Sequence, residues 1–466
     1  MYFIYYLVNI RNSKGLLNYI KFVEGVYNLT KQSIIIICES NYDKNKLEYG
    51  LKGIKTKIII NINSNEIKNL NTNNIELNIN SDYIKSSHSY LFNVENKKYK
   101  NENIMHDDLM RLRILYHGLI QKHKIQAAIV FSNQTFRSVG LIMFQKFVKK
   151  FSLPFYYLTR CPIKGGRYLI YDSIYYDNHK FGNEYNRILN KGINLNEQKY
   201  VDKFIKDYFN FKLNVHMPYF QSIGINQKVF KLSFIKYLSF SKIINKINKI
   251  KNKSQYSKIL NRKRNPNKPY VLLLLTKPNH WFTVFANLDL VDRNNLIQKV
   301  WLSIPNGHDL VLKPHPRSQY DYDLINVIKN KNNCFIEMSS SIYDIVDKSS
   351  IVIFTGSTSG VEALLQFKHV IEIGKRSIIF NFPNSPVKRA KDLSEIKSLI
   401  DECLKENPPN DKIYAFFFKL LKESFALTKD YKKIKEYNNL YSDINIYKNL
   451  SYYLIERMEK DKLLYN

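Results

Sequence analysis

The sequence predicts an α/β protein with two doubly wound domains that face a cleft, followed by a C-terminal helical segment. Its 466 residues are about three times an ordinary domain length, which favours two large domains with an appendage. Short apolar, β-branched runs alternate with helical patterns in both halves, as expected for parallel sheets buried on both faces. A basic stretch separates the halves. We therefore expect an N-terminal domain at 1–238, a basic linker at 239–268, a second domain at 269–410 and a helical segment at 411–466.

The first half has the pattern of a parallel sheet with crossover helices. Strands are expected at the N-terminus and at 33–38, 57–62, 127–131 and 153–158, with an Asn-rich surface excursion at 63–80. The strand at 127–131 leads through a polar turn into a helix at 139–150, which is a crossover unit. Ligands of doubly wound folds gather beyond the carboxyl ends of strands, so we expect 133–135 and 159–167 to lie near a cleft.

The second half repeats this alternation of strand and helix. It opens with the apolar run 269–275, and further strands are expected at 309–313, 351–354 and 370–373. A helix is expected around 294–303. From Lys412 onward the sequence has aromatic and basic helical character without strand patterns.

The chain is strongly basic, with a net charge of +32 from 72 Lys and Arg against 40 Asp and Glu. Such a charge attracts nucleic acid, anionic lipid or acidic polymers, and it also fits a compositional bias on solvated faces. We find no zinc-knuckle spacing, RNA-recognition motif or helix-turn-helix signature, so no nucleic-acid partner is expected.

The cysteines and apolar segments indicate a cytoplasmic protein. Cys38, Cys161, Cys334 and Cys403 are far apart and form no metal-ligand spacing, which favours a reducing environment. The apolar N-terminus lacks a preceding basic region and a cleavage site, so it is interpreted as a first buried strand. No apolar run approaches the ~18 residues that span a bilayer, and any membrane association is expected to be peripheral.

The linker at 239–268 contains ten basic and no acidic residues. Ile243, Ile247 and Ile250 share one helical face and are flanked by four lysines, Lys242, Lys246, Lys249 and Lys253. A basic amphipathic helix of this kind could bind the anionic inner surface of the cytoplasmic membrane. The alternative is a linker helix whose apolar stripe docks on its own domain.

A cationic loop follows the predicted strand at 309–313. Lys313, His315 and Arg317 carry or can acquire positive charge, and Pro314 and Pro316 restrict the backbone between them. A restricted loop loses less entropy when it binds, and the matching ligand is a phosphate. The alternative is a Pro-stiffened surface loop with scattered cations.

A second loop, rich in hydroxyls and glycine, follows the strand at 351–354. Backbone N–H groups at the start of the next helix would face an anion at this turn, which contains Thr355, Gly356, Ser357, Thr358, Ser359 and Gly360. Glu362 has two interpretations. It either accepts hydrogen bonds from ribose or sugar hydroxyls, or completes a Ser-x-x-Glu capping box with Ser359.

The two loops together resemble those of the capsule polysaccharide biosynthesis family, which includes bacterial Kdo transferases of capsule assembly. The resemblance is carried by Lys313-Pro314-His315-Pro316 and by the segment Thr355 to Leu364, and it covers about 125–395. It implies a GT-B fold of two Rossmann-type domains and a CMP-sugar site lined by these motifs. Polysialyltransferases and teichoic-acid glycerophosphotransferases share the pairing more loosely.

The resemblance implies a metal-independent glycosyltransferase without a cofactor, using a nucleotide-sugar and a glycan or glycolipid acceptor. Lys313, His315, Pro316, Arg317 and the second loop would bind the donor phosphate, and His315 would protonate the leaving group. The acceptor is expected near Asn133, Gln134 and Arg160, with Asp172 or Asp177 as the base. The Asp321-Tyr322-Asp323 sequence is interpreted as a solvated helix face rather than a metal site.

Three other functions remain open at this stage. A polyol-phosphate transferase or a nucleotide-sugar 2-epimerase uses the same fold, because a fold does not fix its chemistry. A non-catalytic basic scaffold of a polysaccharide synthesis complex would need neither His315 nor the glycine-hydroxyl turn.

Overall fold

The chain forms two compact units in a computed structural model. The first unit comprises 1–184, 199–215 and 418–466, and the second comprises 185–198 and 216–417. Within these ranges, the structure describes residues 1–7, 13–68, 102–131, 139–163, 167–172, 179–210, 259, 262–276, 292–315, 322–337, 341–356, 358–375, 377, 379–426 and 444–463.

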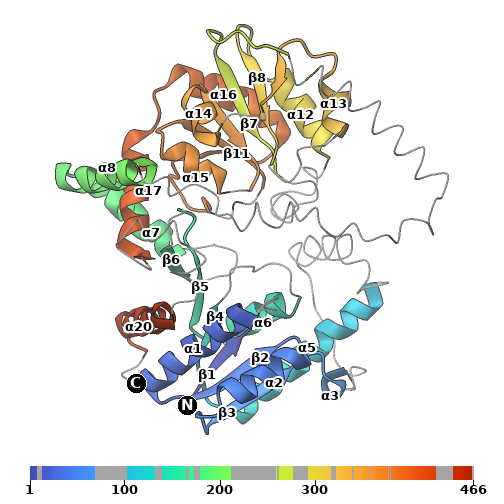
Figure 1. Cartoon of the computed structure of the whole chain (residues 1–466), viewed down its shortest axis with the longest axis vertical. Helices are drawn as coiled ribbons and strands as arrows, with labels where there is room; N and C mark the ends of the chain where they lie inside the picture. Colours follow the sequence, from blue (N-terminus) through green and yellow to red (C-terminus); the bar gives the residue numbers. More distant parts are fainter. Residues whose placement is uncertain are drawn as a thin grey trace, which may run out of the picture. The chain divides into compact units, whose positions relative to one another are not determined.

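The first unit contains a seven-stranded sheet in the order β13-β6-β5-β4-β1-β2-β3 (Figure 1). The strands β1 to β5 are parallel, β6 is antiparallel to β5, and β13 is antiparallel to β6. Their bounds are β1 (Tyr2–Tyr6), β2 (Ser33–Cys38), β3 (Lys57–Asn61), β4 (Ile125–Phe131), β5 (Phe155–Arg160), β6 (Arg167–Tyr171) and β13 (Phe425–Ala426). The chain runs outward from β1 to β3 and then crosses to β4, which makes the sheet doubly wound.

Helices cover both faces of this sheet. They include α1 (Ser13–Thr30), α2 (Asn41–Gly50), α5 (Glu102–Lys122), α6 (Val139–Lys150) and α20 (Ile444–Lys460). The short helix α3 (Asn65–Lys68) follows β3, and the helices α7 (His179–Lys191) and α8 (Leu195–Asn210) are each divided between the two units. Phe131 of β4 stacks on Phe22 of α1 and meets Tyr447 of α20 edge-on. On the opposite face Tyr6 of β1 contacts Phe144 of α6. Aromatic side chains on both faces explain why these strands have nearly continuous apolar sequences.

The C-terminal helix α20 is part of the first unit, where it packs along α1. The Asn18 side-chain amide of α1 donates a buried hydrogen bond to the Tyr447 hydroxyl of α20 at 2.8 Å. A Cβ atom on Gly25 of α1 would lie 2.1 Å from the Ser451 hydroxyl oxygen, so glycine permits the close approach of the two helices. Residues more than 400 positions apart thus share one core.

The second unit contains a parallel sheet of six described strands in the order β12-β11-β10-β7-β8-β9. Their bounds are β7 (Tyr270–Leu274), β8 (Asp309–Lys313), β9 (Cys334–Ile336), β10 (Ile351–Phe354), β11 (His369–Ile373) and β12 (Lys388–Ala390). Numbered within the unit and read from β9, the order is 3-2-1-4-5-6, which is that of a Rossmann sheet. The chain reverses direction across the sheet between β7 and β10, and ligands of such sheets bind beyond this point.

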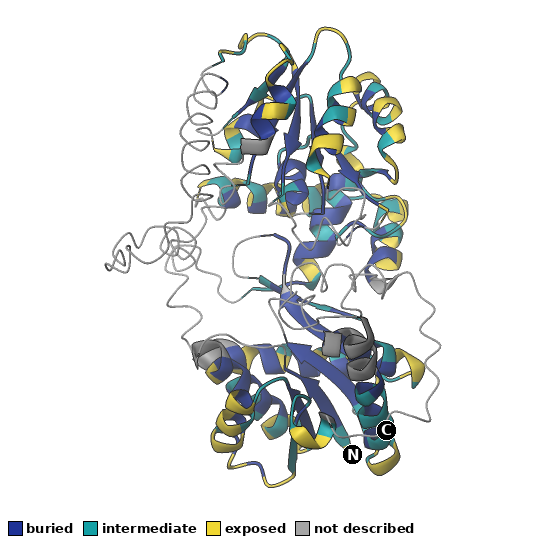
Figure 2. Ribbon diagram, turned by 90° about the vertical axis from the view of Figure 1, so that its right-hand side faces the viewer, coloured by how far each residue is buried: buried dark blue, intermediate teal, exposed yellow. Residues whose placement is uncertain are grey.

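Each face of the second sheet has its own helices. The face that carries Val271 and Leu273 packs on α12 (Arg293–Leu302), α13 (Tyr322–Ile328) and α16 (Ile396–Lys405). The other face carries Tyr270, whose hydroxyl donates to the Ile345 carbonyl of α14 (Ile342–Asp347) at 2.5 Å, and Phe354, which contacts α15 (Ser359–Leu364). Figure 2 shows the resulting layers, with buried strands between helices whose outer sides are exposed. A short 3₁₀ helix η3 (Leu393–Glu395) and α17 (Asn410–Glu423) complete the described elements.

The predicted fold class is confirmed: the chain has two doubly wound, Rossmann-like α/β sheets and a C-terminal helix. The strands expected at 309–313 and 351–354 have the predicted bounds. The segment after Lys412 is not purely helical, because β13 adds a two-residue strand beside β6. Arg167 of β6 holds that turn by donating from Nε to the Ser424 hydroxyl at 2.7 Å and from its terminal nitrogen to the Leu421 carbonyl at 3.1 Å.

Most of the basic linker lies outside the described residues, including Lys242, Lys246, Lys249 and Lys253. Its described end contacts the second unit through Arg262, which donates to the carbonyls of Ile328 and Lys331 after α13. The linker and the domain bounds around it stay predictions. Among the described helices, none is both long and apolar enough to cross a membrane.

Candidate functional site

The cationic loop and the hydroxyl-rich turn begin at the same edge of the second sheet. The strand register places Lys313 of β8 opposite Leu274 of β7, and Leu274 opposite Phe354 of β10. Adjacent strands lie ~4.8 Å apart, so the ends of β8 and β10 are separated by about 10 Å. A phosphate with its attached sugar or nucleoside is large enough to reach both ends.

Lys313 and His315 occupy the β8 side of this edge. Burial lowers the pKa of Lys313 from its ordinary value, and the nearby carboxylate of Glu337 opposes that effect. Glu337 is held beside Lys313 because its backbone N–H donates to the Leu312 carbonyl at 2.9 Å. Pro314 is buried and His315 is half-buried at the start of the loop. A half-buried lysine followed by a half-buried imidazole provides charge and a titratable proton at one strand end.

The turn at the end of β10 is tightly built. Thr355 is 1% exposed, and Gly356 has a φ of 49°, in the left-handed region that favours glycine. Thr358 is exposed and Ser359 half-buried, so hydroxyls remain near the surface of the turn. Gly360 is buried against β10, where an added Cβ would lie 2.5 Å from the ring of Phe354. Glycine at 360 therefore brings the turn close to the strand end.

The capping-box interpretation of Glu362 is wrong. The helix α15 begins at Ser359, and Thr358 before it already has helical backbone angles, so Glu362 is the fourth helical residue. A capping box requires the carboxylate at the third helical position. Glu362 is 4% exposed and belongs to the buried side of the helix. Because α15 has only six residues, its macrodipole is small, and an anion here depends mainly on hydroxyls and cations.

Sequence reasoning missed Glu372, a carboxylate in the same row of the sheet. Glu372 of β11 pairs with Phe354 on one side and with Arg389 of β12 on the other. Burial raises the pKa of Glu372 to about 7, while Arg389 and a hydrogen bond with Ser377 act in the opposite direction. The Arg389 Nε lies 3.9 Å from the carboxylate. An ionisable residue inside the apolar run Val370-Ile371-Glu372-Ile373 was the available signal.

Of the expected acceptor residues, the structure describes Arg160 and Asp172, and it places these two apart. Arg160 ends β5, whereas Asp172 follows β6, which runs in the opposite direction. Arg160 therefore lies at the carboxyl ends of the parallel strands, and Asp172 lies at their amino-terminal ends. Asn133, Gln134 and Asp177 are outside the described residues, as are Pro316, Arg317 and Ser357 of the loops after β8 and β10.

No metal site emerges among the residues that the structure describes, because their His, Cys, Asp and Glu side chains form no group of three or more suited to hold an ion. The four cysteines are buried and free. The described strand ends of the second sheet thus carry a lysine, a histidine, hydroxyls and the carboxylates of Glu337 and Glu372.

Comparison with known proteins gives fold-level similarities only. No protein-family model matches the sequence, and no curated protein sequence matches it. Among solved structures, a KpsC beta Kdo 2,7 transferase of Thermosulfurimonas dismutans is 13% identical, covers 72% of this chain and 89% of its own, and gives a TM-score of 0.38. A glycosyltransferase of Rickettsia africae is 12% identical, with coverage of 95% and 98% and a TM-score of 0.30. A UDP-GlcNAc 2-epimerase of Neisseria meningitidis is 10% identical, with coverage of 90% and 99% and a TM-score of 0.27. At these scores the similarities carry no argument about function, and the candidate site rests on its own geometry.

Proposed function

We propose that the chain is a metal-independent GT-B glycosyltransferase whose second unit binds a nucleotide-activated sugar. The first choice of donor is a CMP-linked, Kdo-like or sialic-acid-like sugar, and the product is a bacterial capsule or other surface polysaccharide. One observation carries the proposal: the loops after β8 and β10 leave the same edge of a Rossmann-ordered sheet, on either side of β7. This edge is where such sheets bind ligands.

In this proposal the donor phosphate lies between the two loops, on the second unit alone. Lys313 supplies a fixed positive charge, and the hydroxyls of Thr358 and Ser359 supply hydrogen bonds, with Arg317 and Ser357 as further partners from the same loops. Negative charge develops on the phosphate as the glycosidic bond breaks, and donors already in place stabilise that charge most effectively. His315 transfers a proton to the departing phosphate oxygen.

The first unit holds the glycan or glycolipid acceptor near Arg160, at the carboxyl edge of its sheet. In this proposal Asp172 is not the base, because it follows the antiparallel strand β6 and lies at the amino-terminal end of the parallel strands. The base that deprotonates the acceptor is therefore left unassigned. Contact of the basic linker with an anionic membrane surface would keep a lipid-linked acceptor nearby.

A nucleotide screen followed by one variant pair tests the proposal. CMP, UDP, CDP and dTDP are compared by thermal shift, since a nucleotide that binds only the folded state raises the apparent stability by about 2.7 kcal/mol at 100 times its Kd. His315→Ala should then lower sugar transfer by about 100-fold or more while the protein stays folded. His117→Ala, in α5 and edge-on to Phe151, is the control that should keep transfer.

The same assay separates the remaining alternatives. Conversion of the free nucleotide-sugar without an acceptor would indicate an epimerase, and transfer from a CDP-linked polyol would indicate a polyol-phosphate transferase. A scaffold would show no shift with any nucleotide. Wild-type transfer by a well-folded His315→Ala protein would refute the proposed role of the loop.

A further inference from the structure

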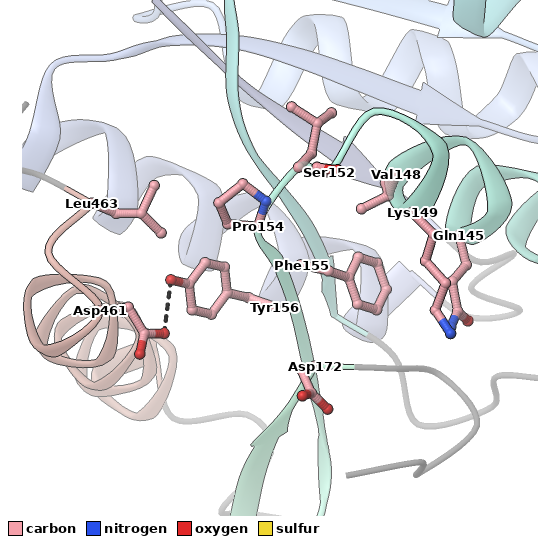
Figure 3. A pocket seen from close by; sticks show the side chains of 11 residues that line it. Gln145, Val148, Lys149, Ser152, Pro154, Phe155, Tyr156, Asp172, Asp461 and Leu463 are labelled. Atoms are coloured by element: carbon pink, nitrogen blue, oxygen red, sulfur yellow. Dashed lines mark hydrogen bonds between the residues drawn. The ribbon is translucent and has the colours of Figure 1, made fainter. Parts of the chain in front are cut away.

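A cavity of about 360 Å³ lies within the first unit (Figure 3). Four parts of the chain line it: the end of α6 with Gln145, the start of β5 with Phe155 and Tyr156, Asp172 after β6, and Asp461 after α20. Its size falls in the range of about 300–1,000 Å³ that is usual for small-molecule sites.

The cavity is at the amino-terminal edge of the parallel strands. It surrounds the first residues of β5, and Asp172 reaches the same edge because β6 is antiparallel, with Tyr171 paired to Tyr157. Figure 3 shows Phe155 on the α6 side of the strand and Tyr156 on the side of α20. The cavity is thus built from both layers of the unit, at the edge opposite to the carboxyl ends where Rossmann sheets bind nucleotides.

Several polar groups of the lining are held in place. The Tyr156 hydroxyl donates to the Asp461 carboxylate at 3.0 Å, and the Arg457 Nε lies 3.7 Å from the same carboxylate. Gln145 is 2% exposed, so its carboxamide is fixed by its surroundings. Groups that are fixed before binding lose little entropy when a ligand arrives, which favours recognition of one shape.

The lining selects against anions and for hydroxyl groups. Two carboxylates face the cavity, and Asp461 is already paired with Arg457. The one cationic residue that lines the cavity, Lys149, is exposed, so the lining offers an anionic phosphate or acidic sugar no buried cation. Carboxylates accept hydrogen bonds, and a carboxamide both donates and accepts them, which matches pairs of adjacent hydroxyls. Phe155 and Pro154 add apolar surface for the C–H face of a ring.

We propose that this cavity binds one neutral monosaccharide unit of a glycan. The inference rests on the proposed function in one respect: it takes the glycan to be part of the acceptor. The cavity would then be a second glycan-binding site of the first unit, in addition to the one proposed near Arg160. Such a point would keep the growing chain attached while its end is extended, because linked binding events reinforce one another.

Saturation-transfer NMR and titration with the methyl glycosides of glucose, galactose and N-acetylglucosamine test the proposal on the full chain. At least one glycoside should bind saturably. Asp172→Asn and Gln145→Met preserve side-chain shape and should each weaken binding about tenfold or more, since each removes a fixed hydrogen-bonding group. Glu456→Gln on the exposed side of α20, where Glu456 pairs with Lys460 at 2.7 Å, is the control that should bind like the wild type.

Three results would overturn the inference. They are the absence of saturable binding of all three glycosides, equal affinity in the wild type and in both cavity variants, and Asp172-dependent binding of spermidine in place of the glycosides. If the Asp172→Asn protein does not fold, the titration of the Gln145→Met protein still shows whether the glycoside binds in this cavity. The thermal shift produced by nucleotides reports on the second unit, so failure at this cavity is distinguishable from failure of the proposed function.

Discussion

The contact between Gly360 and Phe354 gives the sharpest test of how the turn after β10 is built. In Gly360→Ala the new Cβ would lie 2.5 and 2.6 Å from two ring carbons of Phe354, well inside van der Waals contact. The ring cannot move outward easily, because Phe354 is fully buried at the end of β10 and packs edge-on against Phe380. The helix α15 must therefore shift away from the strand.

The expected loss of stability follows from two opposing effects. Inserting a methyl group into a filled core costs about 1–3 kcal/mol. Alanine is favoured over glycine within a helix by up to about 1 kcal/mol, which offsets part of that cost. The net loss is about 1–2 kcal/mol, equivalent to a fall of about 2–8 °C in the Tm of a unit of this size.

Calorimetry of the full chain measures this effect against a matched control. Gly118→Ala, also within a helix, has no atom within 4 Å of the added Cβ and should raise stability slightly. Phe354→Leu removes the ring edge, so adding Gly360→Ala to that variant should cost little. The displaced turn should also weaken nucleotide binding in the single Gly360→Ala variant.

The reasoning fails if Gly360→Ala is as stable as the wild type. It also fails if the cost of Gly360→Ala is the same with Phe354 and with Leu at that position. Either result would mean that the turn is not held against β10 by this contact.

Three further predictions concern Glu372, the helix pair α1 and α20, and the turn after β10. The pKa of Glu372 is raised from 4.5 to about 7, so the folded state holds a proton that the unfolded chain has lost, and stability should fall by up to about 3 kcal/mol as the pH rises between these values. The Tm difference between Glu372→Gln and the wild type should therefore become more positive from pH 5 to pH 8, and parallel curves would contradict this. Tyr447→Phe removes the hydrogen bond from Asn18 and should lower the free energy of unfolding of the first unit by about 1–3 kcal/mol, measured in urea. Ser357→Ala with Ser359→Ala should weaken nucleotide binding by about 0.5–1.5 kcal/mol per hydrogen bond, seen as a smaller ligand-induced thermal shift at unchanged Tm without ligand.

Local sequence was sufficient for the long apolar strands of both sheets and for the loops after β8 and β10, but it did not identify β6, β9, β12 or β13. Runs such as Ile34 to Ile37 and Leu310 to Leu312 are apolar at every position. They are too short for buried helices, so they indicate strands that are buried on both faces. Because parallel strands end at one edge, the placement of Lys313 and Thr355 at that edge also followed from sequence. The start of α15 was misplaced by one residue, since the cap depends on the backbone angles of Thr358.

Tertiary structure decided what depends on direction and on distant contacts. The strand β6 was not expected from the sequence, and its antiparallel pairing with β5 puts Asp172 at the amino-terminal end of the parallel strands, beside a cavity. The raised pKa of Glu372 arises from burial between β10 and β12, which no neighbour in sequence provides. The attachment of α20 to α1 joins the two ends of the chain. The sequence by itself thus determined the long apolar strands of the two sheets and the loops at their ends, because period and burial are local properties. Strand direction, the environment of buried charges and the closing of the first unit by the C-terminus were settled only by the folded structure, because each depends on residues far apart in the chain.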